Sequence, residues 1–181
     1  MEQLAAGSAH GRFQPFHNGH LDYVLQALAR AKHVYIGITQ IIRPPTISSS
    51  GRHRDTSEAN PLSYFERGEI ITATLLSEGV EQRRFSITPF PIEQPAVLHQ
   101  FQPTSITCFT TRLNEWNDEK ITRLRGLGYD VELLNVAQPD GVTIAAGSEI
   151  RRLIREGSPD WKAFVPAGAA RLIEDQYIDR F

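Results

Sequence analysis

The chain has 181 residues, enough for one domain with a sizeable buried core. Its formal net charge is −2 and its pI is near 6.3, whereas a protein that binds bulk duplex nucleic acid is normally basic. No apolar run approaches the roughly 18 residues of a membrane helix. We therefore expect no nucleic-acid partner and no membrane partner.

Cys108 is the only cysteine, which excludes an internal disulfide and a thiolate metal cluster within one chain. The first residues carry neither a basic patch nor an apolar run of signal-peptide length. These features predict a cytoplasmic protein.

Short apolar or β-branched runs alternate with amphipathic stretches along most of the chain, which is typical of βα units and a parallel sheet. The first predicted strand is small and polar for a buried strand. The second predicted helix places Phe65, Ile70, Ile71 and Leu75 inward. The predicted strands cover 4–10, 33–38, 84–90, 105–109 and 130–134, and the predicted helices follow residue 20 and cover 62–76 and 117–127. Between them, residues 39–60 form a long polar segment, and such segments are often functional or mobile.

The C-terminal part is predicted to be helical. Ser148 is expected to cap a helix that runs through Glu156 and ends at Gly157. Ser158 then caps a second helix with Pro159 at its first position, and a last helical segment covers 167–175. We therefore predict an α/β, Rossmann-like doubly wound parallel sheet with a C-terminal helical segment. The expected organisation is a single domain over 1–181, with a core at 1–146 and the helical segment at 147–181.

The stretch "GRFQPFHNGH" (11–20) lies between the first predicted strand and the first predicted helix. Gly11 and Gly19 allow backbone to approach a ligand closely, and a helix N-terminus favours a phosphate. His17 and His20 are three residues apart and share a helix face. With Arg12 they form a compact site for polyanionic oxygen. A metal site is the alternative, but no third ligand stands nearby at a familiar spacing, so we predict none.

The combination of glycine, arginine, proline and H-x-G-H resembles the signature of the nucleotidylyltransferase superfamily. The form G-R-F-Q-P-F-H is most similar to archaeal-type nicotinamide-nucleotide adenylyltransferases. Three further stretches resemble that family in the same order: "NPLSYFERGEII" (60–71), "ITPFPIE" (87–93) and "GSEIRRLIREGSPDWKAFVP" (147–166).

The resemblance implies transfer of AMP from ATP to a nicotinamide-mononucleotide-like acceptor, with release of pyrophosphate. It also implies Mg²⁺ held mainly by phosphate oxygens and water, and a homo-oligomer. An acceptor phosphate is already ionised near neutral pH, so the reaction needs charge stabilisation and alignment more than a strong base.

The resemblance also assigns roles to particular residues. The Glu66–Arg67 pair is interpreted as structural. Arg152 either shares the task of Arg151 or faces solvent, and we favour solvent. For Ser148 a pure capping role is the alternative, and for Trp116 a place in the core. By resemblance His17, His20 and Arg12 are catalytic, Gly11, Phe13, Gly19, Gly147, Ser148 and Arg151 bind nucleotide, and Glu93, His99 and Trp116 are candidates for the acceptor.

The acceptor region departs from the family pattern. Nicotinamide-specific members carry a tryptophan shortly after the segment matching 91–93, and residues 94–101 contain none. Two alternatives therefore stay open. One is a cytidylyl- or adenylyltransferase that acts on another phosphate or phosphonate, and the other is a non-catalytic nucleotide-binding regulator.

Overall fold

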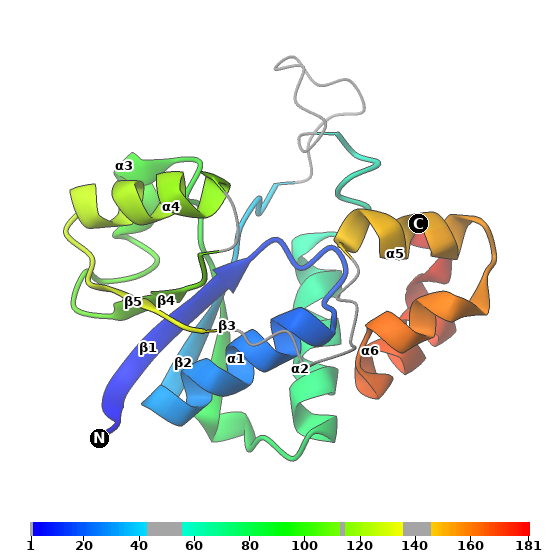
Figure 1. Cartoon of the computed structure of the whole chain (residues 1–181), viewed down its shortest axis with the longest axis horizontal. Coiled ribbons are helices and arrows are strands. Elements are labelled where there is room, and N and C mark those ends of the chain that lie inside the picture. Colours follow the sequence, from blue (N-terminus) through cyan, green and yellow to red (C-terminus); the bar gives the residue numbers. More distant parts are fainter. Residues whose placement is uncertain (1, 43–55, 113–114, 136–145) are drawn as a thin grey trace. The chain divides into compact units, whose positions relative to one another are not determined.

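A five-stranded parallel sheet is present in the computed structural model, which describes residues 2–42, 56–112, 115–135 and 146–181. The strand order is β3-β2-β1-β4-β5, and the order along the chain reverses between β1 and β4, as in a doubly wound Rossmann-like sheet. The predicted fold class is confirmed, and so are the five predicted strands. They are β1 (Leu4–Gly11), β2 (Ala31–Ile38), β3 (Phe85–Pro89), β4 (Thr107–Thr110) and β5 (Val131–Leu133) (Figure 1).

The residues group into two compact units that alternate along the chain. The first unit comprises Met1–Gly11, Asp22–Thr39 and Glu81–Ala137, and so contains the sheet. The second comprises Arg12–Leu21, Gln40–Val80 and Gln138–Phe181. The predicted single domain over 1–181 stays a prediction.

Small residues in the first unit are required by close packing inside the sheet. A Cβ atom on Gly7 of β1 would lie 2.2 Å from the ring of Phe109. One on Gly37 of β2 would lie 2.8 Å from the Cβ of Phe90. The polar composition of the first predicted strand is thus compatible with burial, because large neighbours fill the space that its small residues leave.

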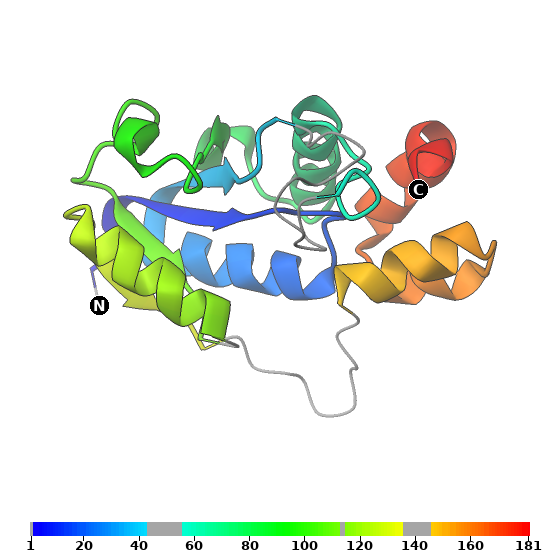
Figure 2. The same ribbon diagram turned by 90° about the horizontal axis from the view of Figure 1, so that it is seen from above.

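Helices α1 (Asn18–Arg30), α3 (Pro95–Leu98) and α4 (Glu115–Gly126) accompany the sheet, α1 beginning in the second unit and continuing in the first. Figures 1 and 2 show α4 running beside β4 and β5, and a cluster that includes Leu98, Cys108 and Leu124 fills part of the core. Helix α1 buries Val24 and Leu28, whereas Leu25 is exposed.

In the second unit, α2 (Tyr64–Ser77) begins with a capping box. The Ser63 side chain accepts a hydrogen bond from the Glu66 backbone, and the Glu66 carboxylate accepts one from the Ser63 backbone. Ile70, Ile71 and Leu75 are buried as predicted. The inward position predicted for Phe65 is wrong, since this side chain is 68% exposed and its neighbours Glu66 and Arg67 take the buried positions.

The C-terminal segment contains α5 (Gly147–Arg155), a 3₁₀ helix η3 (Pro159–Phe164), α6 (Ala167–Leu172), a π-helical turn η4 (Ile173–Tyr177) and a last 3₁₀ turn η5 (Ile178–Arg180). Ser158 caps η3 through the Asp160 backbone, as predicted. Gly157 ends the preceding helix with a φ of 68°, a conformation that favours glycine. Helix α6 packs against α2, where Gly168 approaches Thr74 and Ser77 closely.

The predicted capping role of Ser148 is wrong. The N-cap is Ala146, whose carbonyl accepts hydrogen bonds from the Glu149 and Ile150 backbones, and Ser148 lies within the first turn. Gly147 starts the helix in tight contact with Gln14, so tertiary packing overrides the local preference of serine for the cap. The Ser148 hydroxyl is therefore not used as a cap.

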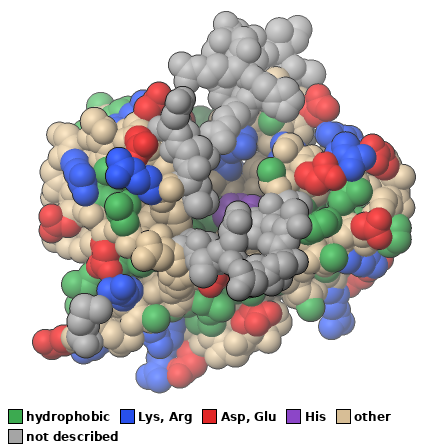
Figure 3. All heavy atoms as spheres, in the orientation of Figure 1, with side chains coloured by type: hydrophobic (Ala, Val, Ile, Leu, Met, Phe, Trp, Pro, Cys, Tyr) green, Lys and Arg blue, Asp and Glu red, His purple; other side chains and the backbone are tan. Residues whose placement is uncertain are grey.

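On the face shown in Figure 3, lysine and arginine side chains alternate with aspartate and glutamate side chains. None of the helices in the described ranges has the length and apolar character needed to cross a bilayer.

Candidate active site

Residues 12–16, which lead into α1, are held firmly by the start of α2. The Arg67 guanidinium, 1% exposed, donates to the backbone oxygens of Arg12 (2.9 Å) and Gln40 (2.8 Å). The Gln14 amide donates to the Leu62 oxygen at 2.8 Å and accepts from the Leu62 nitrogen at 3.0 Å. These contacts support the structural interpretation of Arg67, because the backbone of the segment is fixed by buried hydrogen bonds.

His17 and His20 cap the start of α1 reciprocally. The His17 Nδ1 atom accepts from the His20 backbone nitrogen at 3.3 Å, and the His20 Nδ1 atom accepts from the His17 backbone nitrogen at 3.3 Å. The two rings stack with centroids 3.5 Å apart. This is the geometry of a capping box, with imidazoles in the places that serine and glutamate usually occupy.

The capping contacts determine which ring nitrogens can serve a ligand. Because each Nδ1 accepts a backbone hydrogen bond, each neutral ring carries its proton on Nε2. Burial lowers the pKa of His17 to about 4, so this ring is neutral near pH 7. Both rings thus carry a proton on Nε2, and a protonated ring nitrogen can donate a hydrogen bond to an anionic oxygen.

The beginning of α5 lies beside the segment that leads into α1, as Figures 1 and 2 both show. The Arg151 guanidinium is 4% exposed and donates to the Gln14 backbone oxygen at 2.6 Å. A Cβ atom on Gly147 would lie 2.8 Å from that same oxygen, so only glycine fits there without a shift. Two helix starts that are far apart in the sequence therefore meet at Gln14.

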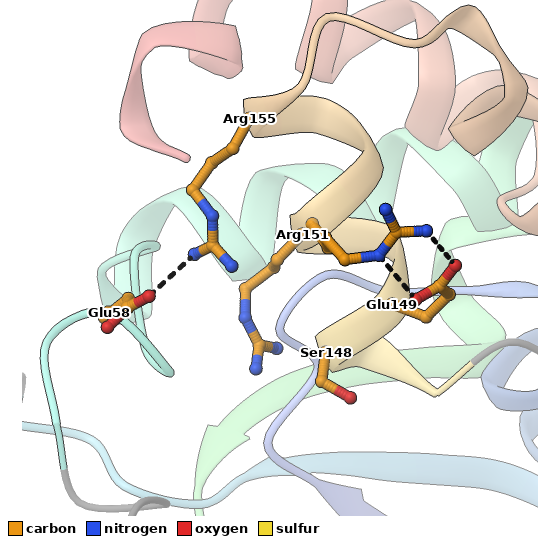
Figure 4. A pocket seen from close by; sticks show the side chains of 6 residues that line it. Glu58, Ser148, Glu149, Arg151 and Arg155 are labelled. Atoms are coloured by element: carbon orange, nitrogen blue, oxygen red, sulfur yellow. Dashed lines mark hydrogen bonds and ion pairs between the residues drawn. The ribbon is translucent and has the colours of Figure 1, made fainter.

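Arg151 also reaches a cavity of about 240 Å³, which Ser148 and Glu58 help to line (Figure 4). Burial, and then the neighbouring Arg155, lower the pKa of Arg151 from its ordinary value. Arg152 pairs with Glu149 and Glu156 on its own helix, and its side chain is 48% exposed. Arg152 thus has the solvent-facing position that was favoured for it.

The other predicted nucleotide-binding residues surround the histidine pair or precede it. Phe13 is buried, has a φ of 54°, and packs edge-to-face on the His20 ring with centroids 4.9 Å apart. Gly19 follows Asn18 in the first turn of α1, and Gly11 ends β1. The Arg12 side chain donates to the Asn60 amide oxygen at 3.4 Å. The roles assigned to these residues stay predictions.

The acceptor candidates Glu93 and His99 are exposed side chains of the first unit. Trp116 belongs to α4, and its side chain lies outside what the structure describes. Residues 43–55, with Arg43, Arg52, His53 and Arg54 of the long polar segment, also lie outside the described residues. The acceptor role of the three candidates stays a prediction.

Several buried polar residues were not predicted. Gln14 joins α2 and α5 to the same backbone segment, and the signal that its sequence position offered is a polar residue between Phe13 and Pro15. In the first unit, Lys120 is 8% exposed and donates to the His10 oxygen at 3.2 Å. The hydroxyl of Tyr23 accepts from the His10 backbone and donates to the Phe109 oxygen. No helical or strand periodicity marks these residues.

Within the described ranges, no group of three His, Cys, Asp or Glu side chains is arranged to hold a metal ion. Mg²⁺ commonly keeps several waters and is bound through substrate phosphates with one or two carboxylates. The magnesium ion that the resemblance implies stays a prediction.

Known proteins resemble this chain along most of its length. A family model described as cytidylyltransferase-like matches residues 8–165. Phosphonoformate cytidylyltransferase of Streptomyces viridochromogenes is 34% identical over 180 residues, covering 98% of this chain and 96% of the relative. Nicotinamide-nucleotide adenylyltransferase of Ignicoccus hospitalis is 29% identical over 173 residues, covering 94% of this chain and 91% of the relative.

Among solved structures, a bifunctional NMN adenylyltransferase/ADP ribose pyrophosphatase from Francisella tularensis has a TM-score of 0.68 at 18% identity. The match covers 98% of this chain and 51% of that protein, so the chain spans about half its length. This likeness supports the fold. The family model, which matches most of the chain, and the relative at 34% identity show that the chain is a nucleotidylyltransferase and belongs to the cytidylyltransferase-like family.

Proposed function

We propose that this enzyme transfers CMP from CTP to a small phosphonate that also carries a carboxylate, with phosphonoformate as the model acceptor, and releases pyrophosphate. The observation that carries the proposal is the likeness, along nearly the whole of both chains, to the Streptomyces phosphonoformate cytidylyltransferase. The absence of tryptophan from residues 94–101 agrees with an acceptor that has no pyridine ring to stack.

In the proposed reaction an ionised phosphonate oxygen attacks the α-phosphorus of CTP. A new P–O–P bond forms, the bond from the α-phosphorus to the oxygen bridging the β-phosphorus breaks, and pyrophosphate leaves with that electron pair. A phosphonate oxygen that is already ionised needs no base. The enzyme therefore contributes alignment and charge stabilisation.

The residues that supply these effects are fixed before substrate binds. The Nε2–H groups of His17 and His20 are proposed to donate to oxygens of the α- and β-phosphates, since their Nδ1 atoms are held by the helix backbone. Arg151, buried and hydrogen-bonded to Gln14, is proposed to bind the leaving phosphates. Mg²⁺ bound with the triphosphate would neutralise part of its charge.

A second candidate is transfer of AMP from ATP to nicotinamide mononucleotide. Its support is the group of archaeal nicotinamide-nucleotide adenylyltransferases, which match about nine-tenths of this chain at 27–29% identity. Both candidates use the same phosphate site, so they differ in the base and in the acceptor.

The experiment is a matrix of CTP and ATP against phosphonoformate and nicotinamide mononucleotide, with pyrophosphate release and product mass measured for each pair. We expect CTP with phosphonoformate to give kcat/KM at least about tenfold above any other pair, the scale on which one or two contacts discriminate substrates. Preferential formation of a dinucleotide from ATP would replace the proposal with the second candidate. Release of pyrophosphate from no pair would contradict both.

A further inference from the structure

One face of α5 carries two arginines that line the same cavity. Arg151 and Arg155 are four residues apart and therefore lie one turn apart on this helix. Figure 4 shows both guanidinium groups on the side that faces Glu58, with the Ser148 hydroxyl at the helix start nearby. The cavity of about 240 Å³ is lined by these four residues together with Glu149 and Arg152.

The charges around this cavity are not balanced. In the described part of the chain Arg151 forms no ion pair, and its one hydrogen bond is to the Gln14 backbone. Arg155 has Glu58 as its ion-pair partner, at 3.4 Å. Arg152 is neutralised by two carboxylates of its own helix, Glu149 and Glu156. Three arginines and two glutamates thus line the cavity, and the formal net charge of +1 on this lining favours an anion.

The ion pair between Arg155 and Glu58 is one that an anion can replace. The Arg155 side chain is 38% exposed and that of Glu58 is 70% exposed, and exposed pairs of this kind add little stability in water. Arginine binds phosphate through two parallel N–H···O bonds, which are stronger than a single loose contact with a carboxylate. Like charges one helical turn apart also repel each other, and a shared anion relieves that repulsion.

We propose that Arg155 is a second phosphate-binding arginine that exchanges Glu58 for the terminal phosphate of the nucleoside triphosphate. Arg151 and Arg155 then hold the leaving diphosphate from one helix face. Glu58 and the third phosphate compete for the Arg155 guanidinium. Nucleotides that lack this phosphate do not reach Arg155. The inference rests on the proposed function only in using a nucleoside triphosphate, and it is independent of the base and the acceptor.

The test compares Arg155→Gln with Arg152→Gln, which removes the same charge from the neighbouring position of the same helix. Equilibrium Kd values are measured by calorimetry for CTP, CDP and CMP, with Mg²⁺ present throughout. If the wild type binds ATP more tightly than CTP, the adenine nucleotides are used. That result counts against the proposed function while leaving the role of Arg155 measurable.

We expect Arg155→Gln to raise the Kd of the triphosphate about tenfold and that of the monophosphate less than twofold. Arg152→Gln should change neither by more than about twofold. Glu58→Gln should tighten triphosphate binding two- to threefold, and this gain should vanish when Arg155 is also replaced. The magnitudes follow from loss of one charge-assisted contact at a partly exposed site.

Equal weakening of triphosphate and monophosphate binding by Arg155→Gln would overturn the proposal, as would equal effects of the two arginine variants. Melting temperatures establish that the variants are folded. If Arg155→Gln unfolds, Arg155→Lys replaces it, because lysine keeps the charge and loses the two-pronged contact. A triphosphate Kd that Arg155→Lys leaves unchanged would then overturn the proposal.

Discussion

Lys120 gives the sharpest test of how this fold tolerates a buried charge. Its ammonium group is 8% exposed, donates to the His10 backbone oxygen, and forms no ion pair within the described residues. Burial lowers the pKa of Lys120 from 10.5 to about 8, so the group is still mostly charged at pH 7. We expect Lys120→Met to make the protein more stable at pH 7, because methionine keeps the length of the side chain and removes the charge.

The magnitude follows from the pKa. Each unit of difference in pKa between the folded and unfolded states corresponds to about 1.4 kcal/mol. Lowering the pKa of Lys120 from 10.5 to about 8 therefore costs about 3 kcal/mol of stability at pH 7. The variant also loses the hydrogen bond to His10 and leaves that carbonyl without this donor, a loss of about 1–2 kcal/mol. The expected net gain is therefore about 1–2 kcal/mol.

The sign of the pH dependence is the stronger check. Between pH 8 and 10.5 the folded protein has released the Lys120 proton while the unfolded chain still holds it. The Lys120 contribution to wild-type stability therefore rises with pH in this window. The advantage of the variant disappears between about pH 9 and 10 and reverses above that, because the variant still lacks the hydrogen bond to His10. Burial raises the pKa of Cys108 to about 11, which acts in the opposite direction. This thiol is present in both proteins, so the difference between them retains only its coupling to Lys120.

The assay is urea unfolding of both proteins at pH 7, 8, 9 and 10, with the difference in unfolding free energy followed against pH. A difference that stays constant from pH 8 to 10 would refute the reasoning about charge. A variant that is less stable at pH 7 by more than about 2 kcal/mol would do the same, since packing would then outweigh the desolvation of the ammonium group.

The remaining predictions concern the phosphate site. His20→Ala should lower turnover by about 10²–10³-fold, the scale for one charge-stabilising donor, with a much smaller effect on triphosphate affinity; turnover equal to wild type would favour a non-catalytic regulator. Arg151→Ala should weaken both triphosphate affinity and rate, and an unchanged Kd would count against its role. Gly147→Ala should cost about 1–3 kcal/mol in urea unfolding, because its Cβ would lie 2.8 Å from the Gln14 oxygen. Gly126→Ala is the control and should cost far less, because among the described residues outside its own helical turn no atom lies within 4 Å of the new Cβ.

The fold was predictable wherever local pattern and burial agree. The run at 33–38 reads as a buried strand because both faces of a central strand are covered, and β2 lies between β1 and β3. The start of α2 carries the S-x-x-E pattern of a capping box, and the structure has the bonds that this pattern predicts. In both places the prediction depends only on residues that are close together in the sequence.

Other features depend on contacts between residues distant in the chain. Ser148 has every local property of a helix cap, but Gln14, more than a hundred residues away, packs against Gly147 and the helix begins there. Phe65 has the right character for a core position, yet Glu66 and Arg67 are buried in its place because they bond to Ser63 and to the backbone of Arg12. A helical pattern of apolar residues places charged residues on the surface, so it does not predict that Glu66 and Arg67 are buried.

In the proposed function the H-x-G-H sequence combines a helix start and a phosphate site, because an imidazole has two distinct nitrogens. In His17 and His20 one nitrogen satisfies the helix backbone, and this contact leaves the proton on the other nitrogen, where an anion needs it. Arg151 is fixed in a similar way, because its guanidinium is buried and donates a hydrogen bond to Gln14. A bound phosphate would offset the cost of removing this charged group from water. Donors fixed in this way need no reorganisation when charge moves onto the leaving group, and preorganisation is a main source of catalysis in phosphoryl transfer. The residues that hold the two helix starts together are therefore also the ones that set the chemistry of the site.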